Sequence, residues 1–460
     1  AWAFDREGAE DLHRIGIAMA GGEDEFKKKP NYILYSEPIS PLVSDFHAMD
    51  KLVYCAKHGI PQDYSPCSIG GATVPASHAG QITVGLSEAM VGVVVAQLIN
   101  GYQLEDLRPI KGLITRHGRT PQSTLQPSQV ADLNKLPTPD YREYFDEMHN
   151  LPPNRRFFPV LNAERSRGCW WRKPTHTGAR RGCAFCNLKL QWRGYRSKEP
   201  RQVAREMEEL AARYASLKFF FVDNILDNNK LPELFRCINN VERDFEIFTE
   251  LRASALRSDL IQMRRTGVTQ VQVGIEALST RLLRKINKGT TAIQNIEIMK
   301  HCEELGIKHL SNLMLGFPGS DEEDVAETLN NLRFVLPFQP LRKVRFWLGQ
   351  NSPVALHPEK HGIRRITNHP HYQILLPDSQ ANSLCLMVKN YVGDRTKQKK
   401  LWRPVAREIE RWQQSYASLR RQHFQTPLLS YRDGGDFLLI RRRGEGSEME
   451  TFRLRETSRA

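Results

Sequence analysis

Two hydrophobic periodicities alternate along residues 158–348 of the chain. Short apolar runs, rich in β-branched and aromatic residues, are separated by segments in which apolar residues recur every three or four positions. The short runs predict buried strands, and the longer period predicts amphipathic helices. The predicted strands cover residues 158–162, 218–222, 245–249, 270–274, 309–315 and 344–348. Six strand–helix units in this order favour a parallel sheet that curls into an open barrel.

The helices predicted between these strands have recognisable boundaries. They cover residues 203–214, 231–238, 293–305 and 320–332. Gly306 can end the third helix, because glycine readily adopts the left-handed conformation found at helix C-termini. Ser320 and Glu323 have the spacing of a capping box at the start of the fourth helix. The sequence therefore predicts an α/β fold with a partial (β/α)6 barrel at its centre.

Polar residues directly follow the second, third and fourth predicted strands. They are Asp223, Asn224, Glu250, Arg252 and Glu276. Because the carboxyl ends of parallel strands meet at one edge of a barrel, and active sites form at that edge, we expect these side chains to contribute to a site. The alternative interpretation is that they are solvated strand ends or helix caps.

Three cysteines precede the second predicted strand. Cys169, Cys183 and Cys186 lie within eighteen residues, and thirteen residues separate the first two. Three thiolates can hold three irons of a four-iron, four-sulfur cluster, whose fourth iron then stays open for a ligand. A structural zinc site with His176 as the fourth ligand is the alternative. The downstream pattern of strands with polar ends favours the cluster.

Composition narrows the class of protein. The 460 residues are enough for two or three domains, and 40% of them are hydrophobic, as in soluble globular proteins. Eight cysteines are too few in a chain of this length for a disulfide scaffold, and they suggest a reducing cytoplasm. No stretch reaches eighteen apolar residues. The longest apolar run, residues 90–99, is expected to form a buried helix rather than a membrane span.

The net charge of +14 suggests an acidic partner, for which RNA, an acidic peptide and a phosphorylated metabolite all qualify. Much of the positive charge is scattered, with clusters at residues 420–421 and 441–443. The usual nucleic-acid-binding motifs do not occur in the sequence. A solvated basic surface is therefore favoured over a nucleic-acid site.

The regions on either side of the predicted barrel have a different character. Proline-rich stretches at residues 136–140 and 151–153 indicate a linker. The C-terminal region is polar and basic, with a helix predicted near residues 402–421. A hairpin is predicted after it, with strands at residues 428–431 and 437–440 and a turn at 433–436.

A series of short motifs follows the predicted barrel. They are Ser166-Arg-Gly-Cys-Trp-Trp171, Cys183-Ala-Phe-Cys186, Tyr195-Arg-Ser-Lys198, Phe221-Val-Asp-Asn-Ile-Leu-Asp227, Val273-Gly-Ile-Glu-Ala-Leu-Ser279, Arg284-Lys-Ile-Asn-Lys-Gly289, Leu315-Gly-Phe-Pro-Gly319 and Tyr431-Arg-Asp-Gly-Gly-Asp-Phe437. Together they make residues 101 to about 440 resemble the radical S-adenosylmethionine (SAM) enzymes. More narrowly, this region is similar to the cobalamin-dependent branch that matures ribosomally made peptides.

This resemblance implies a radical SAM barrel in which Cys169, Cys183 and Cys186 hold a 4Fe–4S cluster. SAM would bind the open iron, and its reductive cleavage would yield a radical that takes a hydrogen atom from an unactivated carbon. The resemblance also implies cofactor-binding roles for Phe185, Asp223, Asn224, Glu250, Arg252, Glu276, Leu315 and Gly316. The first would shield the cluster beside the adenine, and the two residues after the second strand would contact the methionine amino group.

The chain departs from the family pattern at the cysteines and at its start. Family members commonly have three or seven residues between the first two cysteines, and a loop of thirteen can form at small entropic cost. A cobalamin-binding domain usually precedes the linker in this branch. Here only its tail is recognised, at residues 101–140, so cobalamin is implied by the family but its binding domain is reduced to a remnant.

Residues 1–100 carry a second resemblance. Ala20-Gly-Gly-Glu23, Tyr35-Ser-Glu-Pro-Ile-Ser-Pro-Leu42 and Pro66-Cys-Ser-Ile-Gly-Gly-Ala-Thr73 are similar to an internal piece of the trimethylamine methyltransferase family. Members of that family are full barrels that transfer a methyl group to a corrinoid protein. One hundred residues could supply only two or three barrel units, so a folded remnant without activity is expected.

These interpretations divide the chain into four predicted parts. They are a methyltransferase-like barrel fragment (1–100), a linker (101–157), a radical SAM core (158–355) and a small α+β extension (356–460). The leading hypothesis is a cytoplasmic radical SAM enzyme that C-methylates a peptide carrying a leader, with flavodoxin or ferredoxin as reductant and no membrane partner. The alternatives are a corrinoid-linked methyltransferase and a zinc-stabilised or degenerate binding module without catalysis.

Overall fold

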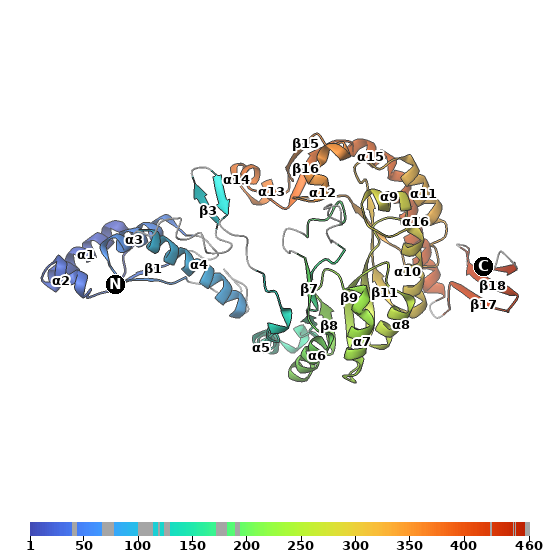
Figure 1. The fold of residues 1–460 in the computed structure, drawn as a ribbon, viewed down its shortest axis with the longest axis horizontal. Coiled ribbons are helices and arrows are strands. Elements are labelled where there is room, and N and C mark those ends of the chain that lie inside the picture. Colours follow the sequence, from blue (N-terminus) through green and yellow to red (C-terminus); the bar gives the residue numbers. More distant parts are fainter. Residues whose placement is uncertain are drawn as a thin grey trace. The chain divides into compact units, whose positions relative to one another are not determined.

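The computed structural model describes residues 1–38, 44–66, 78–99, 114–117, 120–123, 129–171, 182–188, 194–423, 426–444, 446 and 448–455. These form two compact units (Figure 1): Ala1–Val130 with Asp140–Arg156, and Ala131–Pro139 with Phe157–Ala460. The division of the chain into four parts stays a prediction.

The first unit contains short helices around one parallel strand pair. Its elements are α1 (Arg6–Ala20), α2 (Glu23–Lys28), β1 (Leu34–Ser36), α3 (Phe46–His58), β2 (Gln62–Tyr64), α4 (His78–Ile99), the hairpin of β3 (Ile114–His117) and β4 (Thr120–Ser123), and α5 (Arg142–Asn150). Phe26, Leu34 and Cys55 lie in its core. The α1 helix begins at the N-cap Asp5, whose carboxylate accepts from the Gly8 backbone N–H.

The prediction of a buried helix at residues 90–99 is wrong in one respect. This segment is helical within α4, but Met90, Val91 and Val93 are exposed. Val91 and Val93 therefore lie on the surface of a helix whose apolar residues are not confined to one face, which is unusual for a soluble domain. No helix in the described part of the chain is long and apolar enough to cross a membrane.

The second unit is centred on a five-stranded parallel sheet with the strand order β11-β10-β9-β8-β5. The strands are β5 (Leu161–Ala163), β8 (Lys218–Phe221), β9 (Glu246–Arg252), β10 (Val268–Gly274) and β11 (Lys308–Leu310). A second parallel pair, β12 (Asn312–Leu315) and β13 (Arg342–Arg345), joins the sheet through a bridge between Glu276 and Leu313. The predicted α/β fold with parallel strands is confirmed.

Helices connect the strands in the order that the sequence predicts. They are α6 (Pro200–Tyr214), α7 (Leu231–Asn239), α8 (Arg257–Arg265), α9 (Thr280–Lys285), α10 (Ala292–Leu305) and α11 (Glu322–Leu332). Gly306 ends α10 in the left-handed conformation, as predicted. Helices α6, α8 and α10 contact the sheet strands β5, β10 and β11. Along β8 and β9, buried side chains alternate with more exposed ones, so one face of the sheet is covered and the other is open.

Three local predictions differ from the structure. The first strand begins at Leu161 rather than at residue 158, and Phe158 is exposed. The fifth strand is split at Ser311, where pairing changes from β10 to β13. The capping box of α11 is formed by Asp321 and Asp324, not by Ser320 and Glu323, because the Ser320 hydroxyl instead donates to the Phe317 carbonyl.

The C-terminal region adds two small antiparallel sheets and five α-helices among the described residues. The first three helices are short: α12 (Pro353–Leu356), α13 (Tyr372–Leu375) and α14 (Asp378–Ser383). One sheet has the order β14-β16-β15 (Leu348–Gly349, Val388–Val392, Arg365–Asn368). Helices α15 (Arg395–Leu401) and α16 (Arg403–Gln422) follow. The predicted hairpin is present as β17 (Leu429–Asp433) and β18 (Phe437–Arg443), and a third strand, β19 (Met449–Arg455), extends it.

Candidate functional site

Three carboxylates meet at the carboxyl edge of the parallel sheet. Asp223 follows β8, Glu250 lies near the end of β9, and Glu276 follows β10. Glu250 interacts electrostatically with both of the others. Glu250 and Arg252 were expected after the third strand, but β9 continues through Arg252, so both project from the strand itself.

Asp223 is buried and fully engaged with the chain that leads to the cysteines. Its carboxylate accepts from the Arg165 backbone N–H at 3.0 Å and from the Ser166 hydroxyl. Ser166 begins β6 (Ser166–Gly168), which ends one residue before Cys169. Burial raises the pKa of Asp223 to about 7, against the opposing effect of these hydrogen bonds. In this structure the carboxylate anchors the cysteine-bearing segment. Asn224, predicted beside it, is partly buried.

Glu250 carries the next most perturbed carboxyl group of the site. Burial raises its pKa to about 7, and repulsion from Asp223 and Glu276 adds to the increase, while Lys288 opposes it. Gln272 pairs with Glu250 across the open face of the sheet. Phe220 and Phe248, one row away on this face, stack with ring centroids 4.5 Å apart. The open face thus presents an aromatic pair beside an acidic group.

Glu276 is held in a left-handed backbone conformation with φ of 64°. A non-glycine residue reaches this region only when its surroundings fix it. Its N–H donates to the Asn312 carbonyl and its carbonyl accepts from the Met314 N–H. The buried Asn295 amide donates to the carbonyls on either side, of Ile275 and Ala277, at 3.0 and 2.8 Å. The backbone therefore fixes where the Glu276 carboxylate points.

The three cysteines lie close enough to influence one another. Burial raises the pKa of Cys169 and of Cys186, and the neighbouring thiols add to the increase. Lys288 lowers both values, and Arg252, which also lowers that of Cys169, is hydrogen-bonded to Cys183. Two cations therefore stand beside three thiols, which favours an anionic group at this position.

Hydrogen bonds from the Arg284–Gly289 motif hold the segment that carries Cys183 and Cys186. The Ala184 N–H donates to the Ile286 carbonyl, and the Asn287 amide donates to the Gly182 carbonyl, both at 2.8 Å. The Trp171 indole donates to the Asn287 carbonyl at 3.1 Å. A side chain at Gly289 would overlap the Trp171 ring at 2.0 Å, so only glycine allows this approach.

Aromatic rings surround the two cations of the site. The Arg252 guanidinium lies 4.3 Å from the Trp171 ring centroid and 5.6 Å from that of Trp170, and it donates to the Lys288 carbonyl. The Lys288 ammonium lies 5.7 Å from the Phe185 ring and 3.3 Å from the Glu276 carboxylate. Phe185 thus lies near a cation of the site, and its role in shielding the cluster stays a prediction.

Sequence reasoning did not identify Trp170, Trp171, Lys288 or Asn295 as site residues. The two tryptophans and Lys288 do lie within motifs that carry the family resemblance, so those motifs were the available signal. Asn295 belongs to α10 and has no sequence signal, because its role depends on the tertiary packing against Glu276.

The residues present fit an iron–sulfur cluster. Three soft thiolate ligands face two cations, and each thiolate in such a cluster binds its own iron. Within the described residues, no group of three or more His, Cys, Asp and Glu side chains is arranged like the ligands of a single metal ion. The alternative zinc ligand His176 lies outside the described residues.

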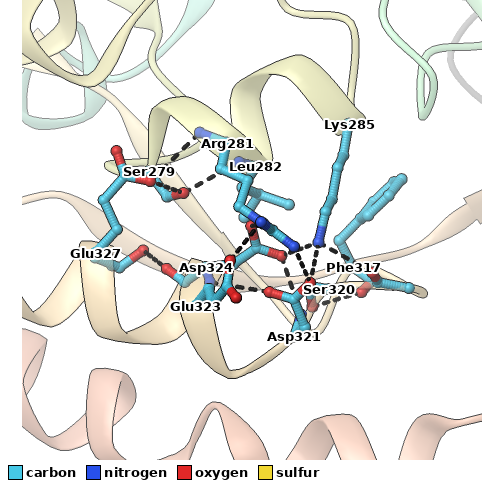
Figure 2. Close-up of polar contacts among 12 residues, drawn as sticks. Ser279, Arg281, Leu282, Lys285, Phe317, Ser320, Asp321, Glu323, Asp324 and Glu327 are labelled. Atoms are coloured by element: carbon cyan, nitrogen blue, oxygen red, sulfur yellow. Dashed lines mark hydrogen bonds and ion pairs between the residues drawn. The ribbon is translucent and has the colours of Figure 1, made fainter.

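Leu315 ends β12 and Gly316 follows it; both were predicted to border the adenine. Polar contacts hold the segment between them and α11 (Figure 2). The Lys285 ammonium bonds Asp321 at 2.7 Å and also the buried Asp324. The Glu327 carboxylate accepts from the Ser279 hydroxyl and from the Thr280 N–H, at 2.7 and 2.8 Å. This network ties the start of α9, which follows Glu276, to α11, which follows this segment.

Two family models match the chain. Residues 174–332 match the radical SAM superfamily, and residues 2–102 match the trimethylamine methyltransferase (MTTB) family. The predicted resemblances to the radical SAM enzymes and to the trimethylamine methyltransferase family are confirmed, and the narrower likeness to the peptide-maturing branch stays a prediction. The match to the radical SAM superfamily implies a 4Fe–4S cluster and SAM as cofactors.

Each of the curated relatives matches only part of the chain. An uncharacterized methyltransferase of Pyrococcus horikoshii is 27% identical over 162 residues, which cover 34% of this chain and 35% of the relative. A glycine betaine methyltransferase of Desulfitobacterium hafniense is 32% identical over 98 residues, which cover 21% of this chain and 20% of the relative. The matched regions span little more than a third of the length of the first relatives.

Among solved structures, the cobalamin-dependent SAM radical enzyme OxsB with aqua-cobalamin and SAM bound has a TM-score of 0.50 and 13% identity. The match covers 87% of this chain and 64% of OxsB. At this identity the likeness supports the fold.

Proposed function

We propose that this chain, whose residues 174–332 match the radical SAM superfamily, cleaves SAM and methylates an unactivated carbon of a ribosomally made peptide. The observation that carries the proposal is the gathering of Cys169, Cys183 and Cys186 at the carboxyl edge of the sheet, beside Arg252 and Lys288. Two of the curated relatives are methyltransferases by name, which supports methyl transfer.

In this proposal the three cysteines hold the cluster. When bound and reduced, the cluster would supply the electron that cleaves SAM to methionine and a radical able to take a hydrogen atom from the substrate, and the methyl group would come from a second molecule of SAM. Arg252 and Lys288 balance the charge of the thiolates. Glu276 and Glu250 lie where they can bind the cationic or hydroxyl groups of the cofactor, and Phe185 excludes water from the cluster.

The substrate would lie against the open face of the sheet. Phe220 and Phe248 offer an apolar surface there, and Glu250 and Gln272 lie next to them. A reduced flavodoxin or ferredoxin would supply the electron, and a reducing cytoplasm would keep the thiols available. Cobalamin as the methyl carrier would be tested separately, since part of its predicted remnant, residues 101–140, lies outside the described residues.

The test is anaerobic reconstitution with iron and sulfide, followed by dithionite and SAM. We expect about four irons per chain and release of 5′-deoxyadenosine. Cys183→Ala should abolish both, whereas Cys385→Ala, at an exposed cysteine remote from the site in sequence, should change neither. Zinc without iron, or equal activity of the two variants, would contradict the proposal.

A second candidate function rests on the match of residues 2–102 to the trimethylamine methyltransferase family. It is methyl transfer from a methylamine to a corrinoid protein. The full chain incubated with trimethylamine and a corrinoid acceptor should give no methylcorrinoid if the first unit is a remnant, and methylcorrinoid if it is active.

A further inference from the structure

The C-terminal sheet of β17, β18 and β19 gathers arginines on one face, where Phe437, Leu439 and Met449 also lie. Residues paired across antiparallel strands share a face, because side chains alternate along each strand. The pairing places five arginines on one face: Arg432, Arg441, Arg443, Arg453 and Arg455. Among the residues of the three strands, no carboxylate lies on this arginine face.

The opposite face is mainly apolar, and its charged residues are Asp433, Arg442 and Glu450. It carries Leu429, Tyr431, Leu438, Ile440, Phe452 and Leu454. Tyr431 is 66% exposed and Phe452 is 44% exposed. Glu450 lies on this face and pairs with Arg442 at 2.7 Å, and the guanidinium of Arg442 also covers the Phe452 ring. These contacts agree with the register that assigns the faces.

The outer strand β19 has an edge suited to pairing. In the described chain it pairs with β18 alone. It is seven residues long, contains no proline and pairs with β18 without a register shift. Natural sheets usually blunt a free edge with a short strand, a proline, a bulge or charged side chains. Along β19 only charged side chains are present, at Glu450, Arg453 and Arg455, so the edge would select its partner by charge.

We propose that the β19 edge binds a peptide strand in which acidic and apolar residues alternate. The acidic residues would lie beside Arg453 and Arg455 on the arginine face. The apolar residues would lie beside Phe452 and Leu454 on the other face, and backbone hydrogen bonds would hold the strand. The inference rests on the proposed function in one respect: the strand would belong to the peptide substrate.

A peptide strand fits this edge better than a nucleic acid does. An RNA strand would use phosphate contacts to the arginines and leave the apolar face uncovered. A β-strand has two faces at the same two-residue period as β19, so it matches both. A partner that contacts both the arginines and the apolar side chains of β19 therefore needs acidic residues on one face and apolar residues on the other.

The binding test uses the full chain and two fluorescent seven-residue peptides of the same composition. One alternates glutamate and valine, and the other carries the glutamates and valines in separate blocks. We expect the alternating peptide to bind about tenfold more tightly, since two cross-strand ion pairs and two apolar pairs together amount to about 1.4 kcal/mol or more. Amide exchange should slow in residues 449–455 when it binds.

Matched variants locate the site. Arg453→Gln with Arg455→Gln should weaken the alternating peptide about tenfold. Arg432→Gln removes a charge from the same face, but on β17 at the far edge of the sheet, and should leave binding within about twofold. Equal losses from both variants, with competition by a single-stranded RNA, would overturn the proposal in favour of general polyanion binding.

Other outcomes are also decisive. Equal affinity for the two peptides would exclude recognition by alternation. A dimer of the chain that protects residues 449–455 without peptide would show that a second copy occupies the edge. The Cys183→Ala chain separates this inference from the proposed reaction: it should keep peptide binding while losing SAM cleavage. Loss of SAM cleavage in the native chain with peptide binding intact would refute only the reaction.

Discussion

At the scale of single residues, Glu276 shows how packing positions a site residue. Its left-handed backbone costs about 1 kcal/mol or more, and Asn295 holds the two flanking carbonyls. Asn295→Leu would remove the Asn295 donor from the Ala277 carbonyl and leave the Ile275 carbonyl with the Ala277 N–H alone, so we expect a loss of about 1–3 kcal/mol in the free energy of unfolding. Denaturant titration measures it.

The matched control is Asn330→Leu on the exposed side of α11, which should change the free energy of unfolding by less than about 0.5 kcal/mol. If Asn295→Leu is as mild as this control, the backbone of Glu276 does not depend on Asn295.

Glu250 makes stability depend on pH. Its folded pKa of about 7 lies above the ordinary value of 4.5, so the folded chain binds a proton that the unfolded chain has released between these values. Stability attributable to this group is therefore present at low pH and is lost as the pH rises toward 7, by at most about 1.4 kcal/mol per pH unit. Asp223 adds a change of the same sign.

The measurement compares unfolding at pH 5.5 and pH 7.5. Glu250→Gln cannot ionise, so the pH-dependent loss should be smaller than in the native chain. Glu246→Gln, at an exposed position on the same strand, should leave the loss unchanged. An unchanged loss in Glu250→Gln would show that this carboxyl group titrates normally.

The residues of the site were predictable where chemistry requires a particular side chain at a strand end or in a short motif. The cysteines and the carboxylates after β8 and β10 belong to this group, and the structure brings them together. Trp170, Trp171 and Asn295 belong to another group, because their roles depend on partners that are distant in the sequence. The partner of Trp170 is 56 residues away, that of Trp171 is 116 residues away, and that of Asn295 is 18 residues away. Distant pairings of this kind leave no local periodicity.

At the scale of elements, strands with strong apolar runs were predictable and strands set by tertiary pairing were not. The split of the fifth strand at Ser311 follows from a change of partner strand. By contrast, β19 has a sequence signal: Phe452 and Leu454 alternate with Thr451, Arg453 and Arg455. The alternation is short and follows a basic hairpin, so it was not recognised.

The α9–α11 network depends on one carboxylate more than on the rest. Glu327 accepts from Ser279 and from two backbone N–H groups at the start of α9. Glu327→Ala should therefore reduce the free energy of unfolding by about 1–2 kcal/mol. Glu323→Ala removes an exposed ion pair with Arg281 and should cost less than about 0.5 kcal/mol. Equal effects would assign no special role to Glu327.

At the scale of the whole molecule, two units carry two different family matches. Every residue of the candidate site lies in the second unit, and the first unit has a core of its own. Residues 2–102 match a family whose relatives are much longer than this segment, and α4 exposes apolar side chains. The sequence predicted both matches but not this exposure, because an apolar run of this length looks the same whether it is buried or not.

The separation of the units leads to the last prediction. A chain that begins at residue 129 keeps the cysteines, the sheet and the C-terminal strands, and it loses the exposed valines of α4. We expect it to bind as much iron and sulfide as the full chain and to release 5′-deoxyadenosine at a rate within about twofold, since no residue placed at the site is removed. Iron analysis and product release under dithionite measure both. If iron binding falls while circular dichroism shows an intact fold, the first unit contributes to the cluster site and the assignment of all site residues to the second unit is wrong.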